Sequence, residues 1–374
     1  MFQIKLMKNR NTRIIAFYLP QFHPIPENDE WWGKGFTEWT NVGKAKSLFK
    51  GHNQPKVPKD LGYYDLRMPE IREAQAKMAH EAGIEGFMYW HYWFGQGKKL
   101  LNLPLDEVIK SQEPDFPFCL GWANHSWYSK NWNKNDTKGE DKLLIEQTYP
   151  GMEDYKAHFY NNLPAFKDHR YLKVNQKCIF LIYAPFDIPN ISLFIKYWRE
   201  LAYENGLKGI HFVGSVRKNS DCDLVLSLGF DAVCRTGIED AHKKIKGKGI
   251  KRIIWEIKKR TQNSNLEKFN YSDIVENLLE PELDKRQDIY PCLVPNFDHT
   301  PRSGNNGLVY INSTPFLFKR LLNRAIKIVS QKKNDNQVIF LRSWNEWAEG
   351  NYIEPDLDHG DGYLKALKSE VLNG

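Results

Sequence analysis

Short runs of apolar residues recur along the chain, rich in β-branched and aromatic side chains, and each is followed by a stretch with helical spacing. Uninterrupted apolar strands of this kind are typical of parallel sheets that helices cover on both faces. We predict eight such strands, at about Arg13–Leu19, Gly86–Trp93, Pro117–Ala123, Cys178–Ala184, Gly209–Val216, Ala232–Thr236, Tyr290–Pro295 and Val338–Trp344.

Three of the intervening segments carry clear helix signals. Pro69–Ala82 has a proline at its first position, spaces small and apolar residues along one face, and is followed by Gly83. Ile191–Glu204 ends before an Asn-Gly pair, and Thr314-Pro315 offers a cap and first turn for a later helix. These segments supply helices between consecutive strands.

Eight strands that alternate with helices predict an α/β protein with a closed (β/α)8 barrel. No glycine-rich nucleotide motif follows the first strand, and no linker or change of composition divides residues 1–374, which we interpret as a single domain. The extra length lies in long loops at Gln21–Met68, Asn124–Pro150 and Gly237–Asp288. Long loops in a compact enzyme are commonly functional.

The most specific segment is Ser343-Trp-Asn-Glu-Trp-Ala-Glu-Gly350, directly after the last predicted strand. In a barrel of this type catalytic groups gather at the carboxyl ends of the strands. Glu346 and Glu349 lie three residues apart, so a helical turn would place both on one face. Glycosidic chemistry requires one group that donates a proton and one that acts as base or nucleophile. We therefore predict a catalytic pair, against the alternative of two solvated surface glutamates.

Polar and aromatic side chains also follow the other strands, and 12 tryptophans give the chain a high aromatic content. Aromatic rings stack on sugars, while amides and carboxylates bind hydroxyl groups; simple packing within the barrel is the alternative for any one ring. The predicted sugar-binding residues are Tyr18, His23, Trp90, His91, Trp93, Trp122, Asn124, Tyr183, Asp298 and Asn345, the last of which could orient either carboxylate.

We predict no metal and no cofactor. His23, His91 and His125 lack zinc-site spacing, and the acidic segment 356–362 resembles a calcium loop but has Gly360 where a fifth-position ligand belongs, so we expect a turn. An odd number of cysteines without CxxC spacing predicts reduced core residues. These are Cys119, Cys178, Cys222, Cys234 and Cys292.

The net charge of +7 is modest, but lysines and arginines concentrate in segment 243–260. We interpret this patch as a solvated helix and loop, with peripheral contact to an anionic membrane or to phosphate groups as the alternative, and we expect no nucleic-acid partner. Residues 1–13 carry charges throughout, and no stretch of about 20 apolar residues follows. We therefore expect a cytoplasmic protein, and contact of this segment with the inner face of the membrane is the alternative.

Several segments together resemble the WbsX-like group, whose domain is similar to glycoside hydrolase family 99. The resemblance covers nearly the whole chain and rests on short motifs in the order of that group. These are Ala16–His23, Gly35–Trp39, Gly86–Phe94, Trp122–Asn124, Asp298–Arg302, Trp344–Gly350 and Glu354–Asp356.

The resemblance implies a barrel with the fold of a retaining glycosidase, in a group that is often labelled glycosyltransferase, and an oligo- or polysaccharide substrate of bacterial surface-polysaccharide biosynthesis that could be lipid-linked. It also implies that Glu346 deprotonates the sugar 2-hydroxyl and that Glu349 is the general acid, through a 1,2-anhydro sugar. Mannose specificity does not carry over, because the first-strand segment and the loop around Asn124-His125-Ser126 differ from the endo-mannosidases. An acid at Glu349 needs a raised pKa, which burial against Trp347 and repulsion from Glu346 would favour.

Two other classes remain open from the sequence. A glycosyltransferase that uses an activated sugar donor normally has a doubly wound sheet and often a DxD motif, and Asp221-Cys222-Asp223 is the candidate here, although it precedes a strand. A glycan-binding protein without catalytic activity would not need the Glu346 and Glu349 pair.

Overall fold

The computed structural model describes residues 12–129, 142–250, 252–253, 255 and 265–372. Eight parallel strands pair in chain order, and β1 pairs with both β2 and β14, so the sheet closes on itself. The (β/α)8 barrel predicted from the sequence is therefore confirmed. Its strands are β1 (Arg13–Tyr18), β2 (Gly86–Trp93), β4 (Phe118–Trp122), β8 (Lys177–Ile182), β9 (Ile210–Val216), β10 (Ala232–Arg235), β12 (Ile289–Leu293) and β14 (Val338–Leu341).

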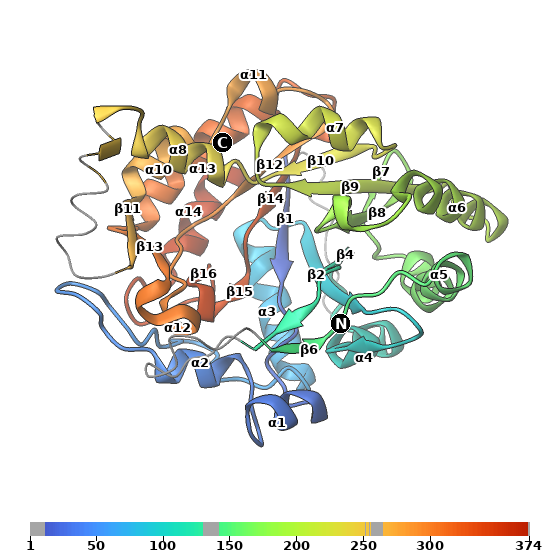
Figure 1. Cartoon of the computed structure of the whole chain (residues 1–374), viewed down its shortest axis with the longest axis horizontal. Coiled ribbons are helices and arrows are strands. Elements are labelled where there is room, and N and C mark those ends of the chain that lie inside the picture. The colour runs from blue at the N-terminus through green and yellow to red at the C-terminus, as the bar shows by residue number, and fades with distance from the viewer. Residues whose placement is uncertain (1–11, 130–141, 251, 254, 256–264, 373–374) are drawn as a thin grey trace.

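Helices surround the barrel, with α5 and α6 on one side of the view and α10, α13 and α14 on the other (Figure 1). The two helices whose bounds the sequence predicted, α3 and α6, have those bounds, and Gly83 ends α3 at a φ of 100°. The Thr314 hydroxyl accepts the N–H of Leu317 at 3.3 Å and caps α13, as predicted. The outer helices are α3 (Pro69–Ala82), α4 (Leu103–Ser111), α5 (Met152–Lys167), α6 (Ile191–Glu204), α7 (Cys222–Ser227), α8 (Ile238–Lys246), α10 (Tyr271–Asn277), α11 (Pro281–Asp284), α13 (Pro315–Val329) and α14 (Gly362–Val371).

The long loops contain further short elements, most of them at the carboxyl end of the barrel. The loop after β1 holds α1 (Pro26–Trp32) and α2 (Glu38–Lys44), which lie together at the lower edge of Figure 1. The remaining short elements are β3 (Lys99–Leu100), β5 (Trp127–Tyr128), β6 (Leu143–Ile145), β7 (Lys173–Val174), β11 (Glu267–Asn270), α12 (Thr300–Ser303), β13 (Leu308–Ile311), β15 (Asn345–Glu346), β16 (Asn351–Tyr352) and the 3-10 turns η1 (Pro185–Asp187), η2 (Asn219–Asp221), η3 (Gly304–Asn306), η4 (Asn334–Asn336) and η5 (Trp347–Glu349).

The strands are almost completely buried, and the core runs continuously from the barrel interior to the layer beneath the helices. All five cysteines are free and buried, as predicted. The acidic segment after β16 forms the predicted turn, in which the Asp356 carboxylate accepts the N–H groups of Asp358 and His359 at 2.9 and 2.6 Å.

The basic segment is only partly described. Lys244 pairs with Glu280 at 2.8 Å and Lys246 with Glu267 at 3.1 Å, so two of its cations have partners within the protein. Residues 251, 254 and 256–264 lie outside the described residues, and the predicted membrane contact of this stretch stays a prediction. None of the helices in the described part of the chain combines the length and the apolar character that a membrane crossing requires.

Candidate active site

A cavity of about 840 Å³ lies where the barrel strands end. Seven of the eight strands contribute a lining residue at or just after their carboxyl ends, and the segment that follows β12 contributes another, which is the usual place for the active site of such a barrel. These residues are Leu19, Tyr92, Ala123, Tyr183, Ser215, Thr236, His299 and Arg342. The loop after β1 adds Glu38, Lys44 and Lys46 from α2 and the residues that follow it.

Glu346 and Glu349 both line this cavity. The chain leaves β14, forms the two-residue strand β15 and turns through η5, so the two side chains emerge from consecutive tight elements. The hydroxyl of Ser343 accepts the N–H of Glu346 at 2.9 Å and fixes the start of the turn. The two carboxyl groups share a hydrogen bond. The sequence prediction of one pocket for both carboxylates agrees with this geometry.

Gly350 ends the turn in the left-handed region at a φ of 63°, and a Cβ added there would lie 2.6 Å from the Asp298 nitrogen. Replacing Gly350 by Ala should lower the free energy of unfolding by about 1–2 kcal/mol through backbone strain. It should lose about 1–3 kcal/mol more because the clash is with backbone and cannot be relieved by a rotamer change. Denaturant unfolding of the variant measures the sum of these two losses of stability.

Gly62 is a matched control, because it has a φ of 61° and no atom within 4 Å of an added Cβ. The Gly62→Ala variant should show the strain alone. Equal losses in the two variants would mean that the contact between Gly350 and Asp298 is not as close as described.

Glu349 is held between two guanidinium groups. Arg302 Nη1 lies 2.5 Å from Oε1, Arg342 Nη2 lies 2.8 Å from Oε2, and the Asn351 amide donates to Oε2 at 3.3 Å. Burial opposes ionisation of Glu349, but Arg302 and Arg342 outweigh it and hold the pKa of Glu349 well below its usual range. The side chain is therefore an anion throughout the physiological pH range.

Glu346 has the opposite environment. Its Oε1 accepts the Trp90 indole N–H at 3.1 Å, and no arginine forms an ion pair with it among the described residues. Burial, together with the charge of Glu349, raises the pKa of Glu346 to about 7. The directions of these two pKa values are opposite to the expectation that Glu349 holds the proton beside an ionised Glu346. The two arginines, which the sequence argument left out, reverse the order.

Of the ten predicted sugar-binding residues, Trp90 and Tyr183 line the cavity, where their rings meet edge to face at 5.8 Å. Side chains alternate along a strand, so the neighbours of Trp90 and Tyr92 point outward. His91 contacts His158 of α5 at 2.8 Å, and Trp93 donates to Asp154 at 3.1 Å. These two residues pack under a helix and do not reach the cavity.

Tyr18 and Trp122 are outward-facing for the same reason. The Tyr18 hydroxyl donates to Gln75 of α3 at 2.7 Å, and the Trp122 indole donates to the Trp93 carbonyl at 2.9 Å. His23 is buried, with Nδ1 2.9 Å from the Pro20 carbonyl, and burial lowers its pKa. The prediction that these three residues line a sugar site is not met by their positions.

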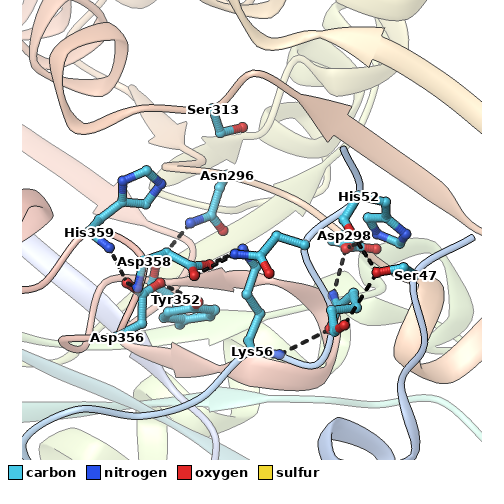
Figure 2. Close-up of polar contacts among 12 residues, drawn as sticks. Ser47, His52, Lys56, Asn296, Asp298, Ser313, Tyr352, Asp356, Asp358 and His359 are labelled. Carbon is cyan, nitrogen blue, oxygen red and sulfur yellow. Dashed lines mark hydrogen bonds and ion pairs between the residues drawn. The ribbon is translucent and has the colours of Figure 1, made fainter. Parts of the chain in front are cut away.

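The residues predicted to bind sugar hydroxyl groups, Asn345, Asn124 and Asp298, form hydrogen bonds to other segments of the chain instead. Asn345 bonds both the N–H and the carbonyl of Leu19, at 2.8 and 3.0 Å, so it does not orient either glutamate. Asn124 joins the ends of β4 and β8 through two bonds of 2.8 Å to the backbone of Ala184. Asp298 accepts His52 Nε2 at 2.8 Å and Gln54 Nε2 at 2.6 Å, and Figure 2 shows it beside His52.

The sequence argument missed several residues that line the cavity. Arg302 bridges the two anions Glu349 and Glu38, with Nη2 3.0 Å from the buried Glu38 carboxylate. Arg342 is the first residue after β14, and a cation directly after an apolar strand was an available signal. Glu38 lies in the Gly35–Trp39 motif, but its place in the cavity depends on a contact with Arg302, 264 residues away in the chain.

The proposed DxD motif does not reach the cavity. Asp221 ends η2, and Asp223 in α7 pairs with Arg286 at 2.7 Å. In the described parts of the chain no cluster of three or more His, Cys, Asp or Glu side chains is arranged to hold a metal ion.

The fold and the site together define a closed (β/α)8 barrel with paired carboxyl groups in a ring-lined cavity at the carboxyl ends of its strands. Solved structures agree on the fold. The chain superposes on two structures of the GH99 endo-alpha-mannosidase from Bacteroides thetaiotaomicron, with TM-scores of 0.57 and 0.54 at 18% and 17% identity, covering 96% of this chain and 96% and 97% of theirs. A glycoside hydrolase-like protein gives a TM-score of 0.57 at 14% identity, covering 99% of this chain and 96% of the other.

The family itself is shown by sequence. The model of the glycosyltransferase WbsX family matches residues 14–367, and the chain belongs to that family. Two curated relatives, from two strains of Xanthomonas campestris pv. campestris, carry the printed description "Uncharacterized protein WxcX" and are 33% identical over 96% and 98% of this chain. The chain spans about half of their length, 49% and 51%.

Proposed function

We propose that the protein breaks or transfers a glycosidic bond in an oligo- or polysaccharide, with Glu346 and Glu349 as its catalytic pair. The observation that carries this proposal is the unequal electrostatic environment of two hydrogen-bonded carboxyl groups in one cavity. One group keeps its proton near neutral pH and the other is an anion. Two carboxyl groups whose pKa values are pushed apart in this way supply the acid and the anion that glycosidic chemistry uses.

The environments favour Glu346 as the proton donor. Its proton would pass to the oxygen of the departing sugar as the bond from the anomeric carbon to that oxygen breaks. The Glu349 carboxylate would then face the positive charge that develops at the anomeric carbon. The 1,2-anhydro route that the family resemblance implies needs a base, and an anion that two arginines stabilise is a weak one. Glu349 is better suited to form a bond to the anomeric carbon as the bond to the departing sugar breaks. In the second step the acceptor would displace Glu349 from that carbon, and the Glu346 carboxylate would take the proton of the acceptor.

The short separation of the pair supports retention of configuration. An inverting enzyme places its carboxyl groups about 6.5–9.5 Å apart to leave room for a water molecule. Here the carboxyl groups interact directly with each other, which is closer to the arrangement of retaining enzymes, whose two groups lie about 5–5.5 Å apart. In a two-step reaction the acceptor enters after the first sugar has left, and it can be either water or another sugar.

Product analysis tests the proposal. Glycans and aryl glycosides are incubated in ¹⁸O-labelled water, and proton NMR follows the anomer that forms first. Retained configuration is expected, and label at the new reducing end distinguishes hydrolysis from transfer.

Glu73→Gln, a change at an exposed residue of α3, is the control for the two active-site variants. Turnover that survives in both Glu346→Gln and Glu349→Gln would contradict the proposal.

The pH profile gives a second test. A required proton on Glu346 predicts that kcat/KM is level at acid pH and falls about tenfold per unit above pH 7. Because Arg342 lowers the pKa of both carboxyl groups, Arg342→Met should move this fall to higher pH. The same variant should add a new loss of activity at acid pH, where Glu349 now takes up a proton.

Arg217→Met is the matched control, because Arg217 is exposed, pairs with Glu239 at 3.1 Å and does not line the cavity. Its profile should match that of the wild type. An unchanged profile in Arg342→Met would show that Arg342 does not set the charge of the pair.

A further inference from the structure

The cavity lining contains more positive than negative side chains. Its cations are Lys44, Lys46, Arg302 and Arg342, and the carboxyl groups that pair with its arginines are those of Glu38 and Glu349. Arg302 forms ion pairs with both Glu38 and Glu349, and Arg342 donates one N–H group to Glu349. Lys44 and Lys46 have no carboxylate within 4 Å in the described chain. These two lysines, together with the remaining N–H donors of Arg342, are left without an anion.

The lysines stand on a fixed stretch of backbone. Lys44 is the last residue of α2, and the flanking side chains of Val42 and Ala45 are buried. The segment that follows is fastened on both sides, since His52 and Gln54 bond Asp298 while Lys56 pairs with Asp358 at 2.5 Å. Figure 2 shows these contacts along one run of chain. The backbone that carries both lysines is therefore held beside the cavity by the fold.

Arg342 has capacity for a ligand as well. One of its donors, Nη2, bonds Glu349, and no acceptor for Nε or Nη1 occurs among the described residues. Its side chain is 24% exposed although it lies at the end of a barrel strand. A guanidinium whose donors face a cavity binds carboxylate and phosphate oxygens well, because its geometry matches theirs.

We propose that the cavity binds a sugar that carries an anionic group, a carboxylate or a phosphate, and that Lys44 and Lys46 bind this group. The inference rests on the proposed function for the sugar and adds the charge of the substrate. Both lysines are exposed and solvated, and a neutral glycan would offer their ammonium groups no ionic partner. An anionic one gains charge-assisted hydrogen bonds and is drawn into the cavity by its field.

Binding of four small probes tests the proposal. Glucose, glucuronate, glucose 1-phosphate and inorganic phosphate are titrated into the full chain and followed by ligand-observed NMR at low salt. At least one of the two anionic sugars should bind about tenfold more tightly than glucose, since a charge-assisted hydrogen bond is roughly twice as strong as a neutral one. The preferred sugar identifies the group, carboxylate or phosphate.

The double variant Lys44→Gln/Lys46→Gln should remove most of this preference and leave glucose binding unchanged. Lys50→Gln is the matched control, because Lys50 is exposed in the same segment and does not line the cavity. Equal binding of glucose and both anionic sugars, or a double variant that binds like Lys50→Gln, would overturn the inference. Inorganic phosphate that binds as tightly as glucose 1-phosphate would also overturn it, because the sugar would then contribute nothing.

The outcomes separate this inference from the proposed function. Glutamate-dependent turnover of neutral glycans without any preference for anions would remove the inference alone. Lysine-dependent binding of anionic sugars without turnover of any glycan would remove the catalytic proposal and leave the binding site in place.

Discussion

Replacement of Glu349 by Gln is expected to lower kcat/KM by about 10³–10⁴-fold on every substrate, the upper part of the range for groups that act on the reacting atoms. The amide keeps the shape of the side chain but removes the negative charge that faces the anomeric carbon. It also leaves Arg302 and Arg342 without their common anion. The loss should be the same for good and poor leaving groups, because the charge is needed in either case.

Steady-state rates on aryl glycosides with a range of leaving-group pKa values measure this effect. Thermal unfolding of the same samples shows whether the unpaired arginines also destabilise the fold. A folded Glu349→Gln variant that is less than tenfold slower than the wild type would rule out the role given to this residue.

Replacement of Glu346 by Gln is expected to slow poor leaving groups by about 10²–10⁴-fold, which is the usual contribution of a general acid. Activated aryl glycosides, whose phenolate leaves without a proton, should keep most of the wild-type rate. The alkaline fall in the pH profile should disappear as well, because the group that titrates near pH 7 is gone.

The two variants together decide which carboxyl group is the acid. If Glu349→Gln shows the dependence on the leaving group and Glu346→Gln loses all substrates, then substrate binding moves the proton within the pair. The assignment made from the family resemblance would then hold, and the one made from the electrostatic environments of the two groups would not.

The barrel was predictable because each of its strands is recognisable from a short stretch of sequence. A run such as Gly86–Trp93 is apolar along its whole length, and burial on both faces is what a strand between barrel interior and helices requires. The predicted strands often extended past the observed ends, as at Val338–Trp344 against Val338–Leu341. The residues beyond a strand are buried too, so composition alone does not mark where the pairing stops.

The site was predictable only in part. The carboxylate pair lies within four residues, so local spacing was sufficient to bring Glu346 and Glu349 together. It was harder to predict which strand residues point into the barrel. His91 and Trp90 are neighbours in the sequence but point to opposite sides of the sheet. The charge of the pair depends on Arg302, which is distant in sequence and meets Glu349 only once β12 and β14 are neighbours.

Asp298 ties the chain around the cavity into one body. Its N–H donates to the Glu349 carbonyl at 2.7 Å. Its carboxylate accepts hydrogen bonds from His52 and Gln54, in the segment that follows Lys44 and Lys46. The backbone on either side of the reaction centre is thus set when the chain folds, before any sugar arrives. An arrangement of this kind spares the enzyme the reorganisation that a loose loop would demand in each catalytic cycle. A substitution at Asp298 would therefore disturb both the turn that carries Glu349 and the segment that follows the two lysines.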